Sequence, residues 1–124
     1  MEKLLIANWK MNPLTELEAV KLAKAIDVQN VVIAAPFPFL SAIKKVIRKA
    51  ELSAQNVFWK ESGAYTGEVS PLMLESIGVR YVIVGHSERR ALGETDLMIN
   101  KKIKAAIQAG LEVILCVGEP WSVR

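Results

Sequence analysis

Five short apolar segments, separated by four segments with helix signals, constrain the fold of this chain more than any other sequence feature. They span residues 4–7, 31–35, 54–58, 81–84 and 113–117, and the third is the weakest. Each is almost continuously hydrophobic, which is typical of parallel strands covered on both faces. The pattern therefore predicts a sheet of buried parallel strands.

The intervening segments carry the start and stop signals of helices. The first helix starts either at Asn12 and Pro13 or at Thr15, where Glu18 completes a capping box. Serine, threonine and proline mark the later starts, and glycine marks the later stops. We expect the first helix to reach residue 26 and the later ones to span about 40–47, 71–77 and 95–109.

Strand and helix alternate four times before a fifth strand, and such spacing suits right-handed parallel crossovers. No linker divides residues 1–124, so we expect one domain. A doubly wound, receiver-like domain would need aspartates after the first and third strands, but Asn8, Lys10 and residues 55–60 include none. We therefore favour an α/β fold of the (β/α)8 barrel type, a partial barrel of five parallel strands and four helices.

Polar residues follow the expected strands at the points where they end. In order, these groups are Asn8 and Lys10, the Pro-Phe-Pro turn 36–38, Lys60 and Glu61, residues 86–90 and residues 118–119. The carboxyl ends of parallel strands meet at one edge of the sheet, where ligands bind in strand–helix folds. His86, the only histidine, is therefore a candidate functional residue. Taken singly, Lys10 also fits a rim lysine, Asn8 a turn former and Glu88 an acid favoured by a helix dipole.

The composition argues against several other classes of protein. The net charge is +3, and lysines such as Lys101 and Lys102 lie among acids at helical spacing, as on solvated helix faces, so we expect no nucleic-acid partner. No apolar segment approaches the length of a membrane span. The single cysteine, Cys116, forms neither an internal disulfide nor a cysteine metal site, so we expect no metal and a cytoplasmic location.

Six motifs together carry a resemblance that covers essentially the whole chain. They are NWKMN at 8–12, APFPFL at 35–40, AQNV at 54–57, GAYTGEVSPLML at 63–74, YVIVGHSERR at 81–90 and LCVGE at 115–119. In this order and spacing the sequence resembles the triosephosphate isomerase family. The resemblance implies the amino-terminal half, residues 1–124, of a (β/α)8 barrel. It also implies interconversion of dihydroxyacetone phosphate and glyceraldehyde 3-phosphate through an enediol(ate), without a cofactor.

The resemblance also assigns roles to individual residues. Lys10 matches the lysine whose ammonium neutralises the substrate's phosphate and the developing oxyanion, and Asn8 matches the substrate-binding asparagine beside it. His86 matches the histidine that polarises the carbonyl and moves protons between the two oxygens. Glu88 matches the glutamate that pairs with the lysine, and Ser87 matches the serine next to the base in the resting enzyme. Proton transfer beside a carbonyl needs such an oxyanion stabiliser and a cation for the phosphate.

The segment GAYTGEVS is similar to the family's protruding loop, which inserts into the neighbouring subunit. The resemblance implies that Tyr65, Thr66 and Gly67 contact that subunit, with Thr66 approaching its active site. It also implies an ionic contact between Glu68 and Arg89 that supports the insertion. We therefore expect further copies of the chain as partners.

Barrels of this type typically need about 250 residues. The family's catalytic glutamate, its closing lid and its glycine-rich phosphate loops correspond to positions beyond residue 124. We therefore expect a complementary carboxy-terminal half chain, further copies of this chain, or both as partners, and an isolated chain that is essentially inactive. The alternatives are a catalytically silent half-barrel that self-associates and a phosphate-binding module that uses Lys10.

Overall fold

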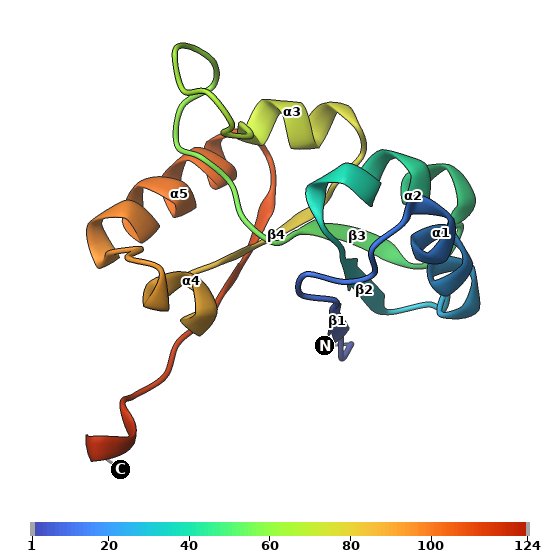
Figure 1. The fold of residues 1–124 in the computed structure, drawn as a ribbon, viewed down its shortest axis with the longest axis horizontal. Coiled ribbons are helices and arrows are strands. Elements are labelled where there is room, and N and C mark those ends of the chain that lie inside the picture. The colour runs from blue at the N-terminus through green and yellow to red at the C-terminus, as the bar shows by residue number, and fades with distance from the viewer. Residues whose placement is uncertain (1, 124) are drawn as a thin grey trace.

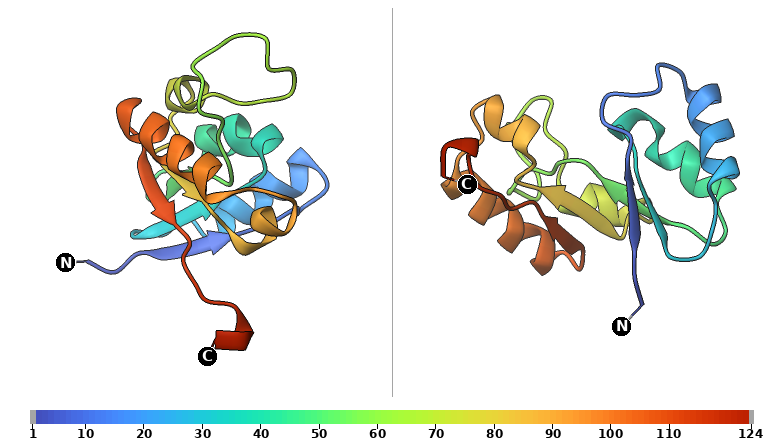
Figure 2. Two further views of the ribbon diagram at one scale, coloured as in Figure 1. Left: turned by 90° about the vertical axis from the view of Figure 1, so that its left-hand side faces the viewer. Right: turned by 90° about the horizontal axis from the view of Figure 1, so that it is seen from below.

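Five parallel strands form the central sheet in the computed structural model, which describes residues 2–123. They are β1 Leu5–Asn8, β2 Val31–Ala34, β3 Glu51–Ala54, β4 Tyr81–Val84 and β5 Glu112–Leu115. The sheet order follows the chain order, and every neighbouring pair is parallel. The sheet curls between α1 and α2 at one end and α4 and α5 at the other (Figures 1 and 2). This is the expected partial barrel.

Within residues 2–123, five α-helices and two 3-10 helices connect or follow the strands. They are α1 Glu16–Ala25, η1 Phe37–Phe39, α2 Leu40–Val46, α3 Pro71–Ser76, α4 Ser87–Ala91, α5 Asp96–Gln108 and η2 Trp121–Val123. The Thr15 side chain accepts a hydrogen bond from the Glu18 backbone at 3.2 Å, so α1 starts at the capping box and not at Asn12. Helix α4 is one more than the four expected. Within residues 2–123, no helix is both long and apolar enough to cross a membrane.

The third strand lies earlier in the chain than the apolar run at 54–58 predicts. It spans Glu51–Ala54 and pairs with β2 and β4. Its polar residues are compensated by partners that the sequence does not reveal: the Glu51 carboxylate accepts from the Arg80 guanidinium at 3.2 Å, and Ser53 Oγ donates to the Ala54 carbonyl at 2.8 Å. Val57, which suggested a strand, is instead a core residue supplied by the following loop.

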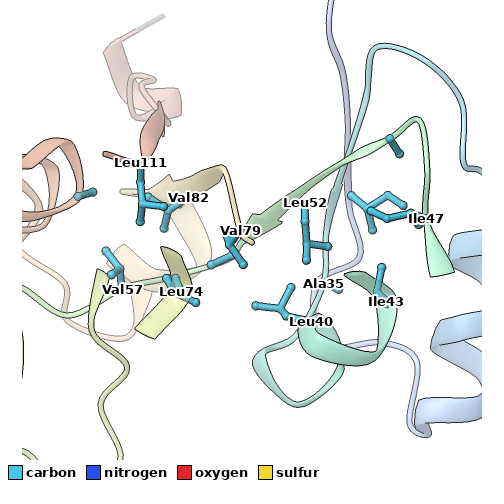
Figure 3. Close-up of a cluster of buried hydrophobic side chains, with 14 of the residues drawn as sticks. Ala35, Leu40, Ile43, Ile47, Leu52, Val57, Leu74, Val79, Val82 and Leu111 are labelled. Carbon is cyan, nitrogen blue, oxygen red and sulfur yellow. The ribbon is translucent and has the colours of Figure 1, made fainter. Parts of the chain in front are cut away.

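The core lies between the sheet and the helices on its outer face. Figure 3 shows two groups of side chains along it, one around Ile43 and Leu52 and the other around Leu74, Val82 and Leu111. Each leucine, isoleucine or valine buried in this way stabilises the fold by roughly 1.5–3 kcal/mol relative to an exposed side chain. Packing of this core therefore holds the strands in place, and with them the polar residues at the strand ends.

Burial falls from the centre of the sheet to its edges. All four residues of β4 are buried, and β2 and β3 are nearly so. The outermost strands, β1 and β5, each pair on one side only, and Leu5 and Leu115 are 69% and 45% exposed. In the described part of the chain, the barrel is therefore open along two edges, as expected for five strands of eight. Exposed edges of this kind favour pairing with a further strand.

Candidate active site at the carboxyl ends of the strands

A cleft of about 650 Å³ lies where β1 to β4 end. Residues at or just after the ends of all four strands line it, among them Asn8, Lys10, the turn 36–38, Gln55, Asn56, His86 and Glu88. Parallel strands carry their carboxyl ends to one side of the sheet, which is why residues about 75 positions apart meet here. The volume falls in the usual range of small-molecule sites.

Lys10 adopts a left-handed backbone conformation in the loop after β1, with φ of 56°. Such a conformation costs a non-glycine residue on the order of 1–3 kcal/mol and persists only when the surroundings hold it. Two side-chain amides do so. Asn8 Oδ1 accepts from the Lys10 backbone N–H at 2.9 Å, and Gln55 Nε2 donates to the Lys10 carbonyl at 2.8 Å.

His86 stands between β4 and α4 and caps the helix. Its Nδ1 accepts a hydrogen bond from the Glu88 backbone N–H at 3.1 Å. This direction requires an unprotonated Nδ1, so we assign the proton of the neutral imidazole to Nε2 from the hydrogen-bond geometry. This cap starts the short helix at residues 87–91, which is not among the four helices expected from the sequence. The arrangement leaves Nε2–H as the imidazole's donor.

The Glu88 carboxylate contacts both the Lys10 ammonium and the His86 imidazole. Its Oε2 lies 3.2 Å from Lys10 Nζ, and its Oε1 lies 3.4 Å from His86 Nδ1. The second contact joins two acceptors when the imidazole is neutral, so the shorter hydrogen bond from the Glu88 backbone defines the ring's orientation. The Lys10 and Glu88 side chains are more than half exposed, so their ion pair contributes at most about 1 kcal/mol to stability.

A buried ionic cluster lies behind this cleft. Glu94 Oε2 accepts from Lys102 Nζ at 2.6 Å and from Arg89 Nε at 2.9 Å, and Lys102 also donates to Asn56 Oδ1 at 2.8 Å. Burial alone would raise the pKa of Glu94, but the hydrogen bonds from Lys102 and Arg89 outweigh it and lower that pKa. The Lys102 side chain is only 3% exposed, so its assignment to a solvated helix face was wrong.

Because β3 ends earlier than predicted, the polar residues at its end differ from the predicted Lys60 and Glu61. The residues that directly follow β3 are Gln55 and Asn56, and both line the cleft. Lys60 and Glu61 lie further along, in the exposed loop, and do not line it. The sequence feature that marks this strand end is the pair Gln55 and Asn56, which directly follows the short segment 52–54.

The loop at residues 60–68 stands out from the sheet beside α3 (Figure 1). The Phe58 N–H closes its base by donating to the Val69 carbonyl at 2.8 Å, and the Tyr65 ring packs on Phe58 with the ring centres 4.8 Å apart. Tyr65, Thr66, Gly67 and Glu68 are exposed, as a contact loop requires. Within the described chain Arg89 is paired with Glu94, and its contact with Glu68 across subunits stays a prediction.

A second cavity, also of about 650 Å³, lies on the other side of His86, toward the segment that follows β5. Ser87, Cys116 and Glu119 line it. Burial raises the pKa of the Cys116 thiol, which is half-buried just beyond β5 and not within it. Residues 2–123 contain no group of three or more histidine, cysteine or acidic residues arranged to hold a metal ion.

Fold and site together define a class. The curled sheet of parallel strands is part of a (β/α)8 barrel. Its cleft, with a lysine and a histidine, lies at the carboxyl ends of the strands, where enzymes with this fold carry their active sites. The triosephosphate isomerase family model matches residues 3–124, so the chain belongs to the triosephosphate isomerase family.

Curated relatives agree with this assignment. The chain is 50% identical over 130 residues to the triosephosphate isomerase of Thermoanaerobacter sp. (strain X514), with 98% of this chain and 52% of the relative covered. It is 49% identical over 136 residues to that of Trichodesmium erythraeum (strain IMS101), with 100% and 56% covered. It is 46% identical over 131 residues to that of Dictyoglomus thermophilum (strain ATCC 35947 / DSM 3960 / H-6-12), with 98% and 53% covered. The chain thus spans about half the length of the curated relatives it matches.

Proposed function

We propose that this chain is the amino-terminal half, residues 1–124, of a triosephosphate isomerase. Completed by a carboxy-terminal half that supplies the catalytic glutamate, it interconverts dihydroxyacetone phosphate and glyceraldehyde 3-phosphate. The observation that carries the proposal is the convergence of Lys10 and His86 on one cleft, both within 3.4 Å of the Glu88 carboxylate. The activity belongs to glycolysis and gluconeogenesis in the cytoplasm.

In this proposal the chain provides the electrophilic side of the reaction. The base removes a proton from the carbon beside the carbonyl, the electron pair forms the enediolate double bond, and negative charge moves to the carbonyl oxygen. The base later returns its proton to the former carbonyl carbon. His86 Nε2–H donates to that oxygen and then moves protons between the two oxygens, while the Lys10 ammonium offsets the charge of the oxyanion and phosphate. Asn8 holds the Lys10 backbone through Oδ1 and donates to the substrate through Nδ2. No cofactor takes part.

The base itself is assigned to the missing half. Glu88 is paired with Lys10. In this proposal Ser87 stands beside the position that the base occupies at rest. Glu61 and Glu68 lie in the exposed loop, and Glu119 lines the second cavity. Of these four carboxylates only Glu88 lines the cleft, and it is paired with Lys10, so the reaction needs a carboxylate from another segment.

A complementation assay tests the proposal. The chain is mixed with the part of the Thermoanaerobacter sp. relative that it does not cover, and isomerisation is followed with a coupled dehydrogenase. We expect turnover from the mixture and negligible turnover from either part, because a positioned base is worth about 10²–10⁴ in rate. Lys10→Met is expected to abolish the activity, whereas the exposed Lys45→Met is expected to keep it. A well-folded mixture that is inactive at every ratio would refute the proposal.

A catalytically silent half-barrel that self-associates is the alternative, and the exposed edge strands favour it. Two copies would contribute ten strands, so simple closure into an eight-stranded barrel is not available to them. Light scattering separates the two ideas. A defined homo-oligomer that ignores the complementary half supports the silent role, and a heteromeric complex supports the enzyme. Contacts of the 65–68 loop and Arg89 with a second copy would be retained in the complex.

A further inference from the structure

We infer that Gln55 is a positioning residue that sets the location of the Lys10 ammonium. Its Nε2 donates to two backbone carbonyls at once, that of Lys10 at 2.8 Å and that of Ala34 at 2.9 Å. A primary amide has two N–H donors on that nitrogen, so both are used. The side chain therefore ties the loop after β1 to the end of β2 from the first position after β3.

The carbonyl that Gln55 holds belongs to the residue with the unusual backbone. At Lys10, the N–H is held by Asn8 and the carbonyl by Gln55, one on each side of a Cα with φ of 56°. Fixing both flanking peptide groups fixes the dihedrals between them, and these dihedrals aim the side chain. The Ala34 carbonyl also accepts from the Trp9 N–H at 3.0 Å, which anchors the same loop to β2.

Few other side chains can do this. A glutamate at position 55 would place carboxylate oxygens against two carbonyl oxygens, and a methionine has a similar length but no donor. An asparagine is shorter by one methylene, about 1.5 Å, so it cannot reach both carbonyls. Without the clamp, we expect Lys10 to relax from its left-handed conformation and its Nζ to leave the 3.2 Å contact with Glu88. This inference rests on the proposed role of Lys10, but the position of Lys10 can be measured without turnover.

The single histidine makes that measurement possible, because all imidazole signals come from His86. Glu88 contacts both Lys10 and His86, so displacing the ammonium changes the field at the ring. The imidazole ¹⁵N chemical shifts are compared at one pH in the chain with Gln55→Met, Lys10→Met and both together. Gln55→Asn serves as the milder variant if Gln55→Met does not fold. Gln108→Met, exposed at the end of α5, is the matched control.

We expect Gln55→Met to move the imidazole signals in the same direction as Lys10→Met, and the double variant to move them no further. Gln55→Asn is expected to give a smaller shift, and Gln108→Met none. Unmoved signals in a folded Gln55 variant, or shifts that add in the double variant, would overturn the inference. A general packing defect moves the signals whether or not Lys10 is present, so the double variant separates the two explanations.

Kinetics of the complemented assembly give an independent reading. A misplacement of about 1 Å costs on the order of 10² in rate, so Gln55→Met is expected to lower kcat/KM by about that factor. In the Lys10→Met background it should cause no further loss of phosphate binding, measured with glycerol 3-phosphate. If the assembly has no activity at all, the proposed function fails, while the imidazole shifts still decide the role of Gln55.

Discussion

Replacing Glu94 by glutamine should destabilise this chain strongly, although the residue lies outside the proposed reaction. The Glu94 and Lys102 side chains are 1% and 3% exposed and 2.6 Å apart, so they form a buried ion pair. Glutamine removes the charge and keeps Lys102 buried, with only neutral oxygens, the glutamine's own amide oxygen and Asn56 Oδ1, as acceptors. Glu94 Oε1 accepts no hydrogen bond from the described residues, so the amide nitrogen would have no partner there. The variant therefore leaves both a buried charge and a buried donor unsatisfied.

The expected loss is about 3–5 kcal/mol, the usual cost of removing one partner of a buried pair. This is a large part of the roughly 5–15 kcal/mol that stabilises a typical domain. Arg89 adds little to the loss, because its side chain is 37% exposed and water can solvate it. Lys102→Met should cost less, about 1–3 kcal/mol, because Glu94 keeps the Arg89 hydrogen bond at 2.9 Å.

Urea denaturation followed by circular dichroism measures these losses, with the exposed Glu61→Gln as control. The pH dependence provides a second check. The pKa of Glu94 is lowered in the folded chain, so its contribution is present above the unfolded pKa and is lost as pH falls through the folded one. The gap between wild type and Glu94→Gln should therefore narrow in acid, below about pH 4. A Glu94→Gln loss under about 1 kcal/mol, matching Glu61→Gln, would show that water screens the cluster and refute the reasoning.

Two further predictions concern backbone positions. Asp27 accepts from the N–H groups of Ala50, Lys49 and Arg48, each at 2.8 Å, and these hydrogen bonds lower its pKa. Asp27→Asn should therefore lower the thermal midpoint at pH 7 and have progressively less effect below about pH 4; an equal effect at pH 3 and pH 7 would contradict this. Gly85 has φ of 78°, and an added Cβ would lie 3.2 Å from an Arg90 guanidinium nitrogen, so Gly85→Ala should cost about 1–2 kcal/mol plus the crowding. Gly110 has φ of 88° and open space around its added Cβ, so Gly110→Ala measures the cost of the backbone conformation alone. An equal loss of unfolding free energy in Gly85→Ala and Gly110→Ala would exclude a contribution from crowding.

The sequence by itself predicted the fold class and part of the candidate site. Apolar runs and capping residues are local signals, and they predicted four of the five strands and gave Thr15 as one of two possible starts of α1. The polar residues after the first and fourth strands predicted that Lys10 and His86 would share a cleft. Parallel strands make this inference reliable, because their carboxyl ends meet at one edge whatever the details of packing.

The tertiary structure alone decided the position of the third strand and the state of the buried polar groups. Glu51, with 38% of its side chain exposed, pairs in β3 with Arg80, 29 residues away, and Lys102 is buried because Glu94 and Asn56 satisfy it. Gln55 reaches Lys10 across 45 residues of chain. Hydrophobic periodicity reports only the average environment of a segment, whereas a buried polar group is tolerated only when a particular distant partner satisfies it. Such partnerships form in three dimensions, which is why local pattern misplaced these residues.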